Sequence, residues 1–144
     1  RDTDRSRGLG DVYKRQEQPE IMDASDWYNV DVITCAAPNL RVQNNYNGKS
    51  SYNNAKKMTN DELLKLHEKR LKRILDTALS EDDETIILGA FGCGAFMNNP
   101  QIVAQAAKNV IREYLYSFKN IEFAVYCSPR DDRNYRIFDR VLKK

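Results

Sequence analysis

The chain has 144 residues, 41% of them hydrophobic, which suits a single globular domain. Its 23 basic and 21 acidic side chains are dispersed and leave a net charge of +2, so charge gives no argument for binding nucleic acid or an anionic membrane. No apolar run approaches the roughly 20 residues that cross a bilayer, so we expect no membrane partner. Three separated cysteines and a single histidine argue against a metal site and predict a cytoplasmic protein with reduced thiols. We expect no cofactor.

The N-terminal segment is treated separately from the rest. Residues 1–16 are polar and without a hydrophobic pattern, and the stretch DVYKRQ at Asp11–Gln16 looks like the translation of a transposon end used in preparing sequencing libraries. We therefore expect residues 1–16 to be an artefactual, disordered tail that does not pack. A genuine disordered basic tail is the alternative. Residues 17–144 are expected to form the C-terminal part of a domain whose N-terminal side is missing.

In the first half of residues 17–144, the sequence predicts a strand, a loop and a helix. Tyr28–Ala37 is apolar and β-branched on both faces from Val30 onward, which indicates a buried strand. Residues 40–58 form a long polar loop. The sequence Thr59-Asn-Asp-Glu62 is a capping box that begins a helix running to about Leu79. We expect this helix to be buried along Leu64, Leu71, Ile74, Leu75 and Ala78.

The second half repeats the alternation. Thr85–Leu88 predicts a second short buried strand, and Asn99 and Pro100 predict the N-cap and first residue of a helix with an apolar stripe reaching Leu115. Residues 121–127 predict a third strand. Residues 134–142 predict a last helix, which turns Tyr135, Phe138 and Val141 or Leu142 inward. Strands and helices that alternate in this way predict an α/β fold with a mostly parallel sheet.

The glycine-rich stretch between the second strand and its helix is the main candidate site. Three of the six glycines of the chain lie within six residues there, at Gly89, Gly92 and Gly94. Glycine lets backbone amides approach a ligand closely, and the helix start near Asn98 offers unpaired N–H groups to a phosphate. Phe91 and Phe96 could pack on a ribose or a base. The alternative is that the glycines only permit tight packing of the strand against the helix.

The stretch does not fit two common nucleotide-binding patterns. No Gly-Lys-Ser/Thr follows it, which excludes an ATP-hydrolysing phosphate loop. Met97 stands where a dinucleotide-binding GxGxxG pattern requires a third glycine.

The sequence GAFGCGAF, between a short strand and NNPQIVAQAAKNVI, resembles the diphosphate-binding loop of macro domains. It is most similar to the GCG-[AV]-F loop of the microbial-type poly(ADP-ribose) glycohydrolases. VDVITCAAPN, LHEKRLKRIL and IEFAVYC extend the resemblance from about Tyr28 to Val141.

The resemblance implies a three-layer α/β/α fold that binds ADP-ribose or an ADP-ribosylated substrate, in a family that hydrolyses a ribose glycosidic bond. It places Gly92–Phe96 around the diphosphate and the distal ribose, with Phe96 positioning that ribose. The whole set of ligand-binding residues that we expect is Gly89, Ala90, Phe91, Gly92, Cys93, Gly94, Ala95, Phe96 and Asn98. Pro38, Asn39 and Tyr135 are expected to border the ligand, and Tyr46 and Tyr52 could stack on adenine.

The chain departs from the family in its catalytic element. The family carries a Gly-rich loop followed by two adjacent glutamates, and this sequence contains neither a GGG nor a Glu-Glu pair. Because glycoside hydrolysis needs a carboxyl group at the scissile bond, we assign no catalytic residue. We expect part of an ADP-ribose glycohydrolase, inactive alone; the alternatives are a non-catalytic ADP-ribose reader and an inactive fragment.

Two further side chains invite a catalytic interpretation. Cys93 could be a nucleophile, but a reactive thiol needs a nearby base, and His67 lies in the middle of a predicted helix. We expect Cys93 to be a small residue in a tight loop and His67 to be a solvent-exposed helix residue.

Overall fold

The computed structural model describes residues 4–7, 21, 23–41, 58–128 and 130–143, which fall into two compact units, residues 1–34 and 35–144. The first unit contains an antiparallel strand pair, β1 (Asp4–Arg7) and β2 (Asn29–Val32), with Asp4 opposite Val32 and Arg7 opposite Asn29. A short 3-10 helix, η1 (Ala24–Asp26), precedes β2.

The observed strand β2 differs from the strand that we predicted at Tyr28–Ala37. It is reduced to the four residues of β2, it is largely exposed, and its partner comes from the segment that we expected not to pack. The physical reason lies in the residues: Asn29 and Asp31 alternate with Val30 and Val32, and this alternation suits a ribbon that is not buried on both faces. Nothing in the described part of the chain pairs β2 with the parallel sheet.

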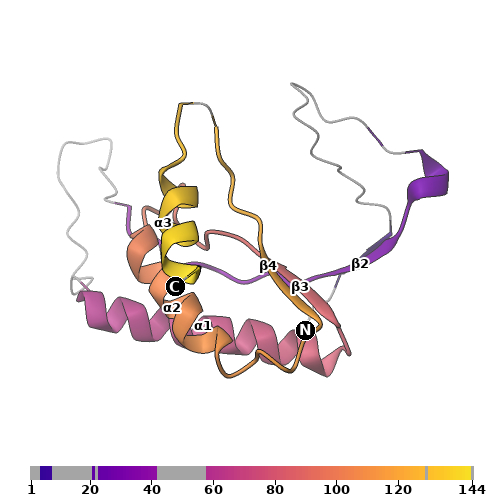
Figure 1. Ribbon diagram of the computed structural model, residues 1–144, viewed down its shortest axis with the longest axis horizontal. Helices are drawn as coiled ribbons and strands as arrows, with labels where there is room; N and C mark the ends of the chain where they lie inside the picture. Colours follow the sequence, from indigo (N-terminus) through magenta and orange to yellow (C-terminus); the bar gives the residue numbers. More distant parts are fainter. Residues whose placement is uncertain (1–3, 8–20, 22, 42–57, 129, 144) are drawn as a thin grey trace, which may run out of the picture. The chain divides into compact units, whose positions relative to one another are not determined.

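The second unit contains that parallel sheet. Strands β3 (Thr85–Leu88) and β4 (Asn120–Phe123) pair side by side, with Thr85 opposite Asn120 and Leu88 opposite Phe123 (Figure 1). Helix α2 (Pro100–Ile111) connects them and packs between α1 (Asn60–Ser80) and α3 (Arg133–Leu142). The α/β class with a parallel sheet is thus confirmed, and the sheet is small and open.

The strands are buried on one face only. Ile86 of β3 is buried, whereas its neighbour Ile87 is 66% exposed. The buried strand predicted at Thr85–Leu88 is therefore buried on one face only. Successive side chains of a strand point to opposite faces, so the described helices cover one of them.

The signals at the helix starts are confirmed. The Thr59 Oγ1 accepts a hydrogen bond from the Glu62 N–H at 3.2 Å, and the Glu62 carboxylate accepts one from the Thr59 N–H at 2.8 Å, which completes the capping box of α1. The Asn99 side chain caps α2 by accepting from the Gln101 N–H at 3.0 Å, with Pro100 as the first helical residue.

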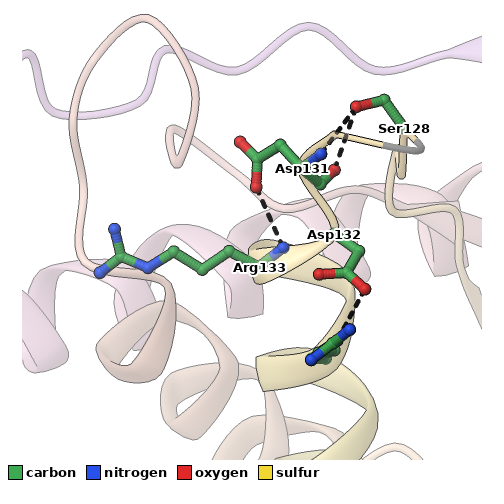
Figure 2. A network of polar contacts seen from close by, with 5 residues as sticks. Ser128, Asp131, Asp132 and Arg133 are labelled. Atoms are coloured by element: carbon green, nitrogen blue, oxygen red, sulfur yellow. Dashed lines mark hydrogen bonds and ion pairs between the residues drawn. The ribbon is translucent and has the colours of Figure 1, made fainter.

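The start of α3 is shaped by polar contacts in the preceding turn. Figure 2 shows Asp131 between Ser128 and Arg133: its N–H donates to the Ser128 hydroxyl at 3.0 Å and its carboxylate accepts from the Arg133 N–H at 3.1 Å. Asp132 accepts from the Arg136 guanidinium at 2.6 Å. Asp131 and Asp132 therefore organise the first turn of α3.

The core lies between the three helices and β3. Its fully or nearly buried apolar side chains are Leu63, Leu75, Ala78, Ile86, Val103, Ala104, Ala106, Ala107, Val110, Phe118, Phe138 and Val141. Helix α2 ends at Ile111, so Leu115 lies outside it and is exposed, contrary to the predicted stripe. Tyr135 of α3 is also exposed rather than inward, whereas Phe138 and Val141 are buried as predicted.

Candidate functional site

The glycine-rich loop joins the end of β3 to the start of α2. We call Gly89–Cys93 together with Asn98 the loop base, and Gly94–Met97 the loop tip. Asn98 and the side chains of Ala90, Phe91 and Cys93 in the base are buried or half-buried, whereas every residue of the tip is exposed. The loop therefore divides into a part held in the protein and a part that faces solvent.

Gly92 is the position where the loop base needs a glycine. Its φ of +76° lies in the left-handed region, which side chains of L-residues rarely adopt. A Cβ on Gly92 would also stand 2.6 Å from the Asn98 Nδ2 and 2.7 Å from the Ala37 Cβ. Gly92 thus allows the glycine-rich loop, Asn98 at the start of α2 and the segment at Ala37 to approach one another closely.

Asn98 fastens the loop from within. Its side chain is 2% exposed, and its Nδ2 donates hydrogen bonds to the carbonyls of Pro38 at 2.7 Å and of Gly92 at 2.9 Å. Its backbone N–H also donates to the Gly92 carbonyl at 3.0 Å. One amide side chain therefore joins the loop to the segment around Pro38, which is distant in sequence.

His67 completes this arrangement from α1, and here the prediction was wrong. The ring is 2% exposed, and its Nε2 lies 2.9 Å from the Asn98 Oδ1. Its face meets Phe91 edge-on, with ring centroids 5.7 Å apart. Burial lowers the pKa of His67 below its usual value, so the ring is neutral at pH 7.

The sequence held a signal for the burial of His67. Residues 63, 67 and 71 are successive i, i+4 positions, so the histidine lies between two leucines on one face of α1. We expected the apolar face to begin at Leu64, but Leu63 is the residue that is buried there. An apolar stripe of α1 that begins one residue earlier, at Leu63, would have included His67.

The loop tip offers backbone donors. Among the described residues, no acceptor is found for the N–H groups of Gly94, Ala95 and Phe96. The N–H of Met97, which has a φ of 59°, turns back to the Gly94 carbonyl at 3.0 Å. Three consecutive amides in exposed residues and without an acceptor are groups that could bind an anion.

The start of α2 offers fewer unpaired amides than we expected: of the N–H groups of Asn98, Asn99 and Gln101, that of Asn99 is the one with no acceptor among the described residues. The Asn98 N–H donates to Gly92, the Gln101 N–H to the Asn99 side chain, and the N–H groups of Ile102 and Val103 to the Asn99 carbonyl. An N-cap side chain and a bound anion use the same N–H donors, and the sequence does not show which of the two takes them.

Phe91 and Cys93 turn toward the core. Both side chains pack, together with Ala90, against the cluster of Val103, Ala104, Phe138 and Val141. Burial raises the pKa of Cys93 to about 11, so its thiol stays protonated at neutral pH. An unreactive Cys93 agrees with its environment, and the contact expected between Phe91 and a ribose stays a prediction.

The remaining candidate residues differ in their distance from the loop. Pro38 is buried against Asn98, and the Leu40 N–H donates to the Phe96 carbonyl at 3.0 Å, so this segment does border the loop. Asn39 is exposed beside it. No hydrogen bond or ring contact is found between Tyr135 and the loop in the described part of the chain, and Tyr46 and Tyr52 lie outside that part. The ligand contacts of all these residues stay predictions.

Two further searches cover the described part of the chain. No three His, Cys, Asp or Glu side chains gather there closely enough to hold a metal ion. None of the helices described has the length and apolarity to cross a membrane.

Comparison with known proteins finds the fold in solved structures. No family model matches the chain, and no curated protein sequence matches it. Poly(ADP-ribose) glycohydrolase from Deinococcus radiodurans, solved in complex with ADP-ribose, superposes with a TM-score of 0.69 at 24% identity, over 89% of this chain and 48% of that one. The enzyme from Thermomonospora curvata gives 0.70 at 23% identity, over 85% and 41%.

These matches establish the fold of the chain. It is the α/β fold of the microbial poly(ADP-ribose) glycohydrolases, as the resemblance of the loop implied. The chain spans about half the length of the structures that it matches, 48% in one and 41% in the other.

Proposed function

We propose that this chain binds ADP-ribose and that the tip of its glycine-rich loop holds the diphosphate. The carrying observation is the row of amides at Gly94, Ala95 and Phe96, which belong to exposed residues and have no acceptor among the described residues. A diphosphate needs several donors at once, and consecutive backbone N–H groups supply them without a charged side chain. The solved glycohydrolase with the same fold holds ADP-ribose, which supports this choice of ligand.

The rigidity of the loop base supports the same proposal. Asn98, Gly92 and Pro38 fix the two ends of the tip through buried hydrogen bonds. A loop that is already ordered does not lose that conformational freedom when it binds, so more of the interaction energy appears as affinity. Phe96 at the tip is half-exposed and would pack on the distal ribose.

We propose further that the parent activity is hydrolysis of an ADP-ribose glycosidic bond. In that reaction the bond from the ribose C1 atom to the leaving oxygen breaks as that oxygen takes a proton from an acid, and the water that adds to C1 gives up a proton, which restores the acid. The sequence contains no adjacent glutamates to match the catalytic pair of the family. The chain would therefore supply substrate binding without the acid.

Binding is tested by calorimetry with ADP-ribose on the full chain and on a Gly94→Val variant. A Cβ at Gly94 meets nothing within 4 Å, and its φ lies outside the left-handed region, so valine is accommodated in the fold and projects into the ligand volume. We expect loss of binding with an unchanged melting temperature. The control is Tyr116→Val at a fully exposed position outside the loop. Unchanged affinity of Gly94→Val would remove the loop tip from the site.

The diphosphate assignment has its own test. ADP should compete with ADP-ribose for the tip, and AMP, which lacks the second phosphate, should compete much more weakly. Equal competition by AMP would place the recognition elsewhere on the nucleotide.

Hydrolysis is tested by incubating the chain with poly(ADP-ribose) and measuring the release of ADP-ribose. We expect binding without release. Release by the purified chain would contradict the proposal that the acid is missing.

A second candidate function is an ADP-ribose reader that never hydrolyses its ligand. The lack of an adjacent glutamate pair favours it. The reading frame upstream of the encoded segment decides between the two: a Gly-rich loop with two glutamates supports the hydrolase, and its absence there supports the reader.

A further inference from the structure

A buried chain of hydrogen bonds runs from helix α1 into the loop. His67 and Asn98 are the polar side chains that the described part of the protein buries almost completely, each 2% exposed. They lie 31 positions apart in sequence and meet at 2.9 Å. Burial of an apolar side chain would cost less free energy at either position, so the filling of space does not explain why both side chains are polar.

The partners of Asn98 determine the direction of this hydrogen bond. The two carbonyls at 2.7 and 2.9 Å can only accept, so the group that faces them is the amide NH2 of Asn98. The Asn98 oxygen therefore faces His67 and accepts from it. It follows that the proton of the neutral ring is on Nε2, while Nδ1 is buried without a hydrogen-bond partner.

The orientation of Asn98 depends on that donor. With the donor in place, the amide can be satisfied in one orientation only. Without it, the Asn98 oxygen would be buried unpaired, and a flipped amide would turn its oxygen onto the carbonyls of Pro38 and Gly92. Either result loosens the contact between the loop base and the segment at Pro38.

We propose that His67 is the positioning residue of the loop: its neutral ring, with the proton on Nε2, fixes Asn98 and through it the conformation of the loop tip. The effect on ligand affinity rests on the function proposed above, whereas the effect on the loop does not. The histidine touches no ligand and acts through Asn98.

Protonation of the ring opposes this arrangement. A second N–H at Nδ1 would be buried without an acceptor. The charged group whose field reaches His67 is Arg70 on the same helix, and it disfavours a second positive charge. The loop contributes the Cys93 thiol, which stays neutral, while the described segment at residues 36–40 and the start of α2 at residues 98–101 contribute no ionisable side chain. Loop order and affinity should therefore decline together below the pKa of His67.

The test compares His67→Gln with His67→Leu in the full chain. The glutamine amide can reach Asn98 with an N–H in place of Nε2, whereas leucine keeps the apolar volume and removes the donor. Hydrogen exchange of the hydrogen-bonded loop amides, those of Cys93, Met97 and Asn98, is the direct readout, and it needs no ligand. We expect faster exchange there in His67→Leu, and protection close to that of the wild type in His67→Gln.

Ligand binding and a stability control complete the test. Affinity for ADP-ribose should fall about tenfold in His67→Leu, the loss of one hydrogen bond, and recover in His67→Gln. Its decline at acidic pH should disappear in His67→Gln, which cannot titrate. The control Leu75→Ala, at a fully buried core position of α1, lowers global stability and should leave the loop exchange pattern unchanged relative to the helices.

The outcomes separate the two proposals. Equal loop protection in wild type and His67→Leu, or equal loss in His67→Leu and His67→Gln, would overturn the positioning role. If the wild type does not bind ADP-ribose while the loop responds as expected, the positioning role stands and the proposed function fails.

Discussion

The base and the tip of the glycine-rich loop are adjacent in sequence and opposite in physical character. In the base, Gly92 is enclosed by Asn98 and Ala37, whereas a side chain at Gly94 in the tip would meet nothing within 4 Å. The base is tied internally by the side chain and the N–H of Asn98, whereas three consecutive N–H groups of the exposed tip have no acceptor among the described residues. Two glycines in one motif thus differ in their surroundings: at Gly92 chain segments pack closely, and at Gly94 a side chain would meet open space.

The largest effect is expected from exchanging the two glycines in turn for alanine. Gly92→Ala combines left-handed backbone with contacts of 2.6 and 2.7 Å, and should lower the free energy of unfolding by roughly 3 kcal/mol. Gly94→Ala should change it by less than about 0.5 kcal/mol. Urea unfolding measures both. Similar losses for the two variants would mean that base and tip are equally constrained.

A second contrast compares thiols inside and outside the loop. Burial raises the pKa of Cys93 to about 11 from an ordinary 9.0, while Cys127 is exposed after β4. A rise of that size reduces the thiolate fraction roughly a hundredfold, and the thiolate is the reactive form. Iodoacetamide at pH 8 should therefore label Cys127 first and Cys93 last, as peptide mass spectrometry would show. Early labelling of Cys93 would mean that the base opens readily.

The neighbouring asparagines at the end of the loop give a third, smaller contrast. Asn98→Ala removes the side-chain donor of the Pro38 and Gly92 carbonyls and the acceptor of the His67 ring, while the backbone N–H of residue 98 still reaches Gly92, and it should cost about 2 kcal/mol. Asn99→Ala removes only the exposed N-cap of α2 and should cost about 1 kcal/mol. Thermal unfolding of the two variants side by side measures the difference. A larger loss of thermal stability in Asn99→Ala than in Asn98→Ala would contradict this comparison.

The smallest effect is a dependence of stability on pH. Burial holds the pKa of His67 below 6.5, so the unfolded chain binds a proton at a higher pH than the folded chain does. This contribution to stability is complete above pH 6.5 and is lost as the pH falls through the folded pKa. Urea unfolding of wild type and His67→Gln between pH 5 and 8 isolates it, because carboxylates contribute equally to both. Parallel pH profiles would show that His67 is not buried in its neutral form.

The sequence by itself determined the local structure of the helical part. Thr59 with Glu62 and Asn99 with Pro100 mark the starts of α1 and α2, and Thr85–Leu88 matches β3, because caps and short apolar runs act within a few residues. The glycine spacing also located the candidate loop and, through its resemblance, the fold that the comparisons show.

Only the tertiary structure decided what each of these residues faces. The sequence could not show that residues 4–7 pair with β2, that Ile87 is exposed, or that Phe91 turns to the core, because these depend on segments that are distant along the chain. His67 is the clearest case. Its helical position was readable, but its hydrogen bond to Asn98 exists only because the fold brings α1 against the loop base.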